Sequence, residues 1–114
     1  PVTPMDPWAW VRAASQHQSP GSAISVRAAF AAATRGAWRA GGVRDGLTGT
    51  LVAGAPASYA VWETNAFAVS APADSVQRWS TDSRSRVSAL PRLEPGDPSP
   101  RCRQTVHRGM VLHG

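Results

Sequence analysis

The sequence contains no lysine and a single cysteine, Cys102. A Walker A phosphate loop and a Schiff-base enzyme both require a lysine amine, so the absence of lysine excludes both. One cysteine cannot form a disulfide within the chain and is compatible with the cytoplasmic location that we expect. No apolar run approaches the roughly 18 residues that a membrane span needs, so we expect no membrane association.

Large aliphatic side chains are also scarce. Leu, Ile, Val and Phe together number 19 of 114 residues, whereas Ala alone numbers 20, and Gly plus Pro number 20. The first figure falls below the roughly 20% at which a chain begins to lack material for a core. The length allows one domain at most. We therefore expect no large autonomous core, and we interpret the chain, which opens at Pro1 rather than Met, as a piece of a longer protein.

Two helices are predicted in the first third of the chain. Asp6 and Pro7 are typical of an N-cap and a first helical position, with Met5 and Trp10 placed for a hydrophobic staple, so a helix is predicted over 7–15. Ser25 is a second N-cap, and Gly41 and Gly42 are typical of a helix end. The second helix, over 25–40, is expected to pack through a stripe made of Val26, Ala29, Phe30, Ala33 and Ala37.

The remainder of the chain favours short strands and turns. Strands are predicted over 50–52, 59–62 and 67–69, and one or two helical turns are predicted from Asp74 to Trp79. The proline-rich stretch 90–100 is predicted to be an extended connector. Residues 102–113 predict a hairpin that turns at Arg108 and Gly109.

No catalytic or metal-binding motif emerges from the residues themselves. In the predicted hairpin His107 faces Met110 and Gln104 faces His113, so at most two of Cys102, His107 and His113 converge, whereas zinc requires three or four ligands. Serines form no nucleophile elbow, and the carboxylates are scattered singly. The net charge of +5 fits nucleic-acid binding, but the arginines are dispersed and the tryptophans are expected in the core, so a nucleic-acid partner is not expected.

Four segments, in order and in register, resemble the closing part of the family-3 amidohydrolases, which are metal-dependent hydrolases of the amidohydrolase superfamily. They are residues 1–8 (PVTPMDPW), 28–40 (AAFAAATRGAWRA), 49–62 (GTLVAGAPASYAVW) and the tail over 90–109. The resemblance implies an α/β fold in which a (β/α)8 barrel carries a small β domain. Residues 1–46 would be the end of the barrel, comprising the loop after strand 8 and the last helices. Residues 47–114 would supply C-terminal strands of the composite β domain, with the connector at 90–100; the isolated chain would be α+β.

The resemblance also implies where the chemistry lies. A Gly-Ser-Asp-x-Pro-Val motif ends strand 8 in this family, and Pro1 and Val2 match its last two residues, which places the catalytic Asp two positions before Pro1. The metal-binding histidines, and any carboxylated lysine, would also lie upstream. Pro1, Val2, Pro7 and Trp8 would wall a substrate pocket on the active-site face of the barrel. The alternative for Trp8 is that it packs the start of the helix.

The sequence departs from the family pattern at one place. Ser58 stands where the family has Asp in a Gly-x-Pro-Ala-Asp motif. That Asp is expected to hold the turn into the following strand, since Asp accepts hydrogen bonds from nearby N–H groups. Serine can accept such a bond but carries no charge.

The sequence thus predicts the C-terminal part of a metal-dependent amidohydrolase that hydrolyses a non-peptide C–N bond in a small-molecule substrate. The resemblance implies catalysis by metal-activated hydroxide, with Asp shuttling the proton and zinc as the expected divalent metal. The chain itself is expected to hold no cofactor, to be inactive alone and to require the N-terminal barrel portion, in cis or in trans. The alternatives are a small basic nucleic-acid-binding protein and a subunit that completes a split barrel.

Overall fold

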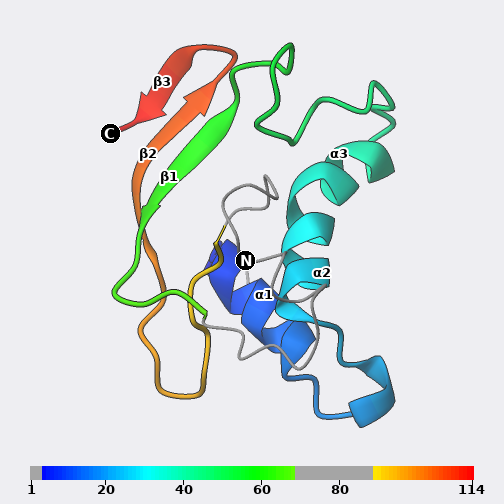
Figure 1. Ribbon diagram of the computed structural model, residues 1–114, viewed down its shortest axis with the longest axis vertical. Coiled ribbons are helices and arrows are strands. Elements are labelled where there is room, and N and C mark those ends of the chain that lie inside the picture. The colour runs from blue at the N-terminus through cyan, green and yellow to red at the C-terminus, as the bar shows by residue number, and fades with distance from the viewer. Residues whose placement is uncertain (1–3, 69–88) are drawn as a thin grey trace. The chain divides into compact units, whose positions relative to one another are not determined.

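The computed structural model describes residues 4–68 and 89–114. Two compact units are present, one formed by residues 1–63 with 101–114 and the other by residues 64–100. The first unit combines helices with an antiparallel sheet, which confirms the α+β class (Figure 1). Its elements are α1 (Pro7–Ser15), a 3-10 turn (Pro20–Ser22), α2 (Val26–Ala31), a π-helical turn (Ala32–Gly36), α3 (Ala37–Ala40), β1 (Tyr59–Glu63), β2 (Arg101–His107) and β3 (Met110–His113).

Helix α1 begins where the sequence predicts. The Asp6 carboxylate accepts hydrogen bonds from the backbone N–H groups of Trp8 and Ala9, each at 3.1 Å, and Pro7 occupies the first turn. These bonds satisfy two of the N–H groups that every helix leaves without a partner at its start. The staple predicted between Met5 and Trp10 does not bury Met5, which is 80% exposed.

The second predicted helix is present but is not continuous. Ser25 caps α2 by accepting a hydrogen bond from the N–H of Ala28, and the helical stretch ends at Ala40 before two glycines. A π-helical turn interrupts it, and inside this turn the Thr34 hydroxyl donates to the carbonyl of Phe30 at 2.9 Å. A π turn holds more residues than an α turn, so the residues after it rotate away from the predicted stripe. Ala29 is accordingly buried whereas Ala33 and Ala37 are exposed, which corrects the prediction of a single packing stripe.

The loop after α3 replaces the strand predicted over 50–52. The backbone N–H and the hydroxyl of Thr50 both donate to the carbonyl of Leu47, and the N–H of Ala55 donates to that of Val52. These bonds close two consecutive turns, so the prediction of a strand here is wrong. Ahead of them, the Asp45 carboxylate accepts hydrogen bonds from the N–H groups of Leu47 and Thr48 at 2.9 Å.

The sheet has the order β1-β2-β3, with antiparallel neighbours (Figure 1). Arg108 and Gly109 connect β2 to β3 with φ angles of 48° and 80°, as in the two-residue turns that match the twist of a hairpin. The predicted hairpin and its turn are therefore confirmed, including the pairing of His107 with Met110. A bulge next to Thr105 then shifts the register, so Thr105 rather than Gln104 lies opposite His113.

The unit of residues 64–100 contains the proline-rich connector. Phe67 forms a single antiparallel bridge with Pro91, and the N–H of Ala68 donates to the carbonyl of Leu90 at 2.8 Å. Of the strand predicted over 67–69, the described part is thus this bridge, while residue 69 lies outside the described residues. The helical turns predicted from residue 74 to 79 also lie outside them. Beyond Pro91 the connector runs without helix or further bridge up to β2, as predicted.

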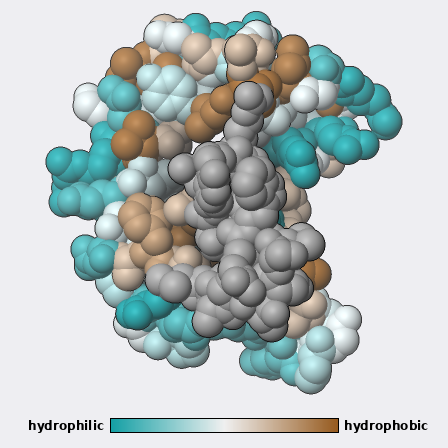
Figure 2. Space-filling view, viewed as in Figure 1, coloured by the Kyte–Doolittle hydropathy of each residue, from teal (hydrophilic) through white to brown (hydrophobic). Residues whose placement is uncertain are grey.

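Few apolar side chains are buried in the part of the chain that the structure describes. Those of the first unit are Trp8, Val11, Ala29 and Val106, and those of the second are Leu90, Leu93 and the prolines Pro91 and Pro100. Large apolar side chains are exposed on β1 and β3, including Tyr59, Val61, Val111 and Leu112. Figure 2 shows hydrophobic surface interspersed with hydrophilic surface. The described residues include no helix with the length and apolar character of a membrane span.

Candidate functional site

The four residues expected to wall a substrate pocket are only partly within the described chain. Pro1 and Val2 lie outside it, whereas Pro7 and Trp8 form the first turn of α1. Pro7 is half-buried, and Trp8 is 5% exposed. The role of these residues at a substrate pocket stays a prediction.

Trp8 is the centre of an aromatic cluster. Its ring stacks on Phe30 of α2, with centroids 5.8 Å apart and an interplanar angle of 16°. Trp62 of β1 meets Trp8 edge-on, with centroids 5.9 Å apart and an angle of 90°. Both geometries are favourable because the face of an aromatic ring is negative and its edge is positive. An edge-on contact joins the two, and an offset stack keeps the two faces from lying directly over each other. The cluster therefore joins α1, α2 and β1, and it places Trp62 in a structural contact, as the sequence predicts.

The Trp8 indole N–H lacks a hydrogen-bond acceptor among the described residues. The nitrogen of this group is buried. A buried indole N–H normally has an acceptor, because leaving it unsatisfied costs about 1–3 kcal/mol. Sequence patterns give no sign of this, since the packing around a tryptophan is set by residues far along the chain.

Potential metal ligands do not converge among the described residues. No group of three or more His, Cys, Asp or Glu side chains lies close enough there to hold a metal ion. Cys102 instead has its sulfur 3.5 Å from the hydroxyl of Thr105 and 3.7 Å from the carbonyl of Gln104. Zinc sites take three or four such ligands from the protein. The donors within residues 4–68 and 89–114 therefore do not form a site for the metal that the family resemblance implies.

Ser58 joins two turns that lie fifty residues apart in the sequence. Its Oγ accepts a hydrogen bond from the N–H of Arg108 at 3.0 Å and lies 3.4 Å from Nδ1 of His107. The carbonyl of Ala57 accepts from the N–H of Gly109 at 2.9 Å. Position 58 therefore holds the β2–β3 turn against the entry into β1. The sequence predicts a turn-holding role for this position, but it does not indicate the distant turn that Ser58 contacts.

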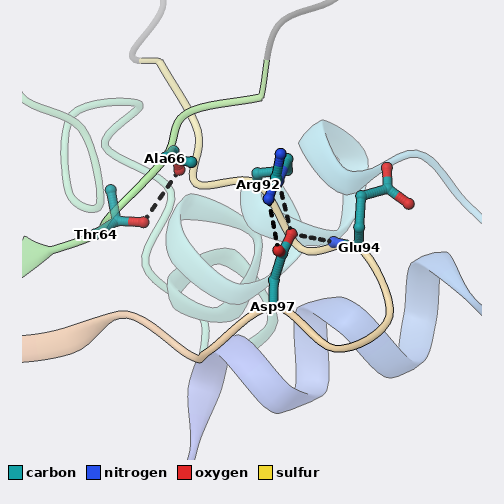
Figure 3. Close-up of polar contacts among 5 residues, drawn as sticks. All are labelled: Thr64, Ala66, Arg92, Glu94 and Asp97. Atoms are coloured by element: carbon teal, nitrogen blue, oxygen red, sulfur yellow. Dashed lines mark hydrogen bonds and ion pairs between the residues drawn. The ribbon is translucent and has the colours of Figure 1, made fainter.

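The clearest charged contact is in the second unit (Figure 3). Arg92 donates two hydrogen bonds to the carboxylate of Asp97, at 2.9 and 2.8 Å, and the same carboxylate accepts from the N–H of Glu94 at 3.0 Å. The side-chain hydrogen bond and the charge of Asp97 raise the pKa of Arg92 above its ordinary value. In the same unit the Thr64 hydroxyl donates to the carbonyl of Ala66 at 3.1 Å. These bonds shape the turn of the connector and assemble no reactive group.

In the first unit, hydrogen bonds lower the pKa of Asp45. The hydroxyl of Thr48 donates to its carboxylate at 2.6 Å, and this bond, with the N–H groups of Thr48 and Leu47, holds the pKa of Asp45 below its ordinary value. Each of these donors stabilises the charged carboxylate, and the group remains in solvent. Asp45 therefore organises a loop.

Comparison with known proteins supports the resemblance. A sequence model of the amidohydrolase family matches residues 1–113. No curated protein matches the chain, and no solved structure matches it. The family model spans nearly every residue, including the helices, the loop over 45–58 and the sheet described above. The chain therefore belongs to the amidohydrolase family.

Proposed function

We propose that this chain is the C-terminal part of an amidohydrolase that hydrolyses a non-peptide C–N bond in a small-molecule substrate. The observation that carries the proposal is the family match over residues 1–113. The four sequence segments that resemble the end of family-3 enzymes support the same assignment. In this proposal the helices of residues 1–46 close a (β/α)8 barrel, and strands from residues 47–114 belong to the composite β domain.

The metal ligands and the catalytic Asp are proposed to lie upstream of Pro1, in the remainder of the barrel. The ground for this placement is the match of Pro1 and Val2 to the last two residues of the family's Gly-Ser-Asp-x-Pro-Val motif, which puts the Asp two positions upstream. The partner of this chain is then the N-terminal barrel portion, joined in cis or supplied by a separate polypeptide. Without that portion the chain is proposed to be inactive.

The chain's own contribution to the reaction is proposed to be enclosure of the substrate. Residues in the loops that follow barrel strands lie on the active-site face of such barrels. In this assignment Pro1, Val2, Pro7 and Trp8 belong to the segment after strand 8, in which Pro7 and Trp8 form the first turn of α1. Rigid apolar groups at such a place would exclude water from the bound substrate and restrict its orientation.

The test is to read the coding sequence immediately upstream of Pro1 and to produce the longer protein that it encodes. An in-frame Gly-Ser-Asp preceded by barrel strands is expected. The longer protein should hydrolyse cyclic amides or N-acylated amines when it is loaded with a divalent metal. The 114-residue chain alone is the matched control and should show no turnover. Replacing the Asp of the upstream motif by Asn should abolish turnover in the longer protein.

Two outcomes would contradict the proposal. The first is turnover by the 114-residue chain alone at the rate of the longer protein. The second is an upstream sequence that encodes no barrel, together with no separate polypeptide that restores activity when the two are mixed.

A further inference from the structure

Asp45 is followed by a glycine, and this pair is the place where the backbone is most open to rearrangement. An aspartate rearranges when the backbone nitrogen of the next residue attacks the side-chain carbon Cγ, which requires an N–H and is hindered by a side chain on that next residue. Of the other aspartates, two precede proline, which has no N–H, and two precede serine. Gly46 alone offers an N–H without a side chain.

The structure leaves room for this reaction at Gly46. The φ angle of Gly46 is +72°, and no atom lies within 4 Å of the position that a Cβ would take there. Asp45 and Gly46 are both exposed, so water, which leaves and enters during the reaction, reaches them from solvent.

Hydrogen bonds restrain the carboxylate of Asp45. One oxygen accepts from the N–H groups of Leu47 and Thr48, each at 2.9 Å, and the other accepts from the Thr48 hydroxyl at 2.6 Å. With both oxygens held, the carboxylate cannot turn freely to present Cγ to the Gly46 nitrogen. The same bonds lower the pKa of Asp45 and so favour the charged carboxylate, which resists attack more than the neutral acid does.

We infer that Asp45 and Gly46 form a modification site, at which Asp45 converts to isoaspartate through a cyclic imide, and that the Thr48 hydroxyl slows this conversion. The site and its restraint belong to the chain itself, so the inference is independent of the proposed function.

The conversion needs no reactant other than water. In the neutral acid form of Asp45, the Gly46 nitrogen forms a bond to Cγ and loses its proton, while the bond between Cγ and the hydroxyl breaks, so one water molecule leaves. Water then adds to the imide. Breaking the bond from nitrogen to Cγ restores aspartate, whereas breaking the bond from nitrogen to the main-chain carbonyl carbon of Asp45 leaves the chain linked through the side chain, as isoaspartate.

The experiment compares the full chain with its Thr48→Val variant at a mildly acidic pH, in water enriched in heavy oxygen. Each opening of the imide incorporates one heavy oxygen atom. Peptide mapping with an endoproteinase that cuts before aspartate but not before isoaspartate locates the product. Thr48→Val should raise the rate of conversion at Asp45 about threefold to tenfold, the range expected for the loss of one hydrogen bond.

Thr50→Val is the matched control, because the Thr50 hydroxyl donates at 2.6 Å to the carbonyl of Leu47 rather than to the carboxylate. This variant loses a hydroxyl from the same loop and should leave the rate at Asp45 unchanged. In concentrated urea, which removes the loop structure, the parent chain and both variants should convert at one rate. That rate should exceed the rate of the parent chain without urea.

Three results would overturn the inference. They are equal rates for Thr48→Val and Thr50→Val without urea, a parent chain that converts equally fast with and without urea, and isoaspartate that forms faster at another aspartate than at Asp45 in urea.

Discussion

Gly49 is the position at which a single methyl group should disturb the first unit most. Its φ is +86°, and a Cβ added there would lie 2.6 Å from Cα and 2.8 Å from the backbone N of Arg35. Backbone atoms of a helix cannot swing aside as the end of a side chain can. Gly49→Ala should therefore combine the cost of a left-handed backbone, about 1–2 kcal/mol, with an overpacking cost of about 1–3 kcal/mol.

Gly54→Ala is the matched control for this prediction. Gly54 has nearly the same φ, +89°, but a Cβ there would meet nothing within 4 Å. It should therefore show the backbone cost alone, about 1–2 kcal/mol. Urea denaturation followed by tryptophan fluorescence measures both variants, and Trp38, whose ring would lie 3.0 Å from the new Cβ at Gly49, is a local reporter. Equal losses in the free energy of unfolding for the two variants would refute the argument from close approach.

Three further outcomes follow from the hydrogen bonds described above. Ser58→Ala should lower the free energy of unfolding by about 1 kcal/mol, since the N–H of Arg108 loses its acceptor. Ser58→Asp keeps an acceptor and should retain stability. Thermal melts of the two variants test this difference. Asp6→Ala should cost about 0.5–2 kcal/mol and reduce the helical circular dichroism signal; an unchanged signal would argue against the cap. Asp45 has a lowered pKa, so its contribution to stability is present above the unfolded-state pKa and is lost as pH falls through the folded-state value. Thr48→Val should raise that pKa toward its ordinary value, as ¹³C NMR titration of the carboxyl can show, and no change would contradict the role of the hydroxyl.

The features that the sequence predicts well are those set by neighbouring residues. A side-chain oxygen followed by a helical run is enough to place the starts of α1 and α2, at Asp6 and Ser25. A glycine in a two-residue turn is enough to place the bend at Arg108 and Gly109. In each case the atoms that make the bond lie within a few residues of one another.

The features that the sequence does not predict depend on distant partners or on a choice between close alternatives. The π-helical turn at 32–36 changes which alanines face inward, although the same residues would suit an α-helix. The bulge near Thr105 moves the register by one residue. For the candidate site, the sequence selects Trp8 but cannot indicate that its ring packs between Phe30 and Trp62, because these residues lie far along the chain.

The pairing of Glu63 with Arg101 has a consequence for how this region can change over evolution. These residues are opposite each other at the ends of β1 and β2, so the segment 64–100 leaves the sheet and returns to it at adjacent points. The entropic cost of bringing together the two ends of a connecting segment rises only with the logarithm of the segment's length. Insertions or deletions between these two positions should therefore be tolerated by the sheet, and relatives can be expected to differ most in length there.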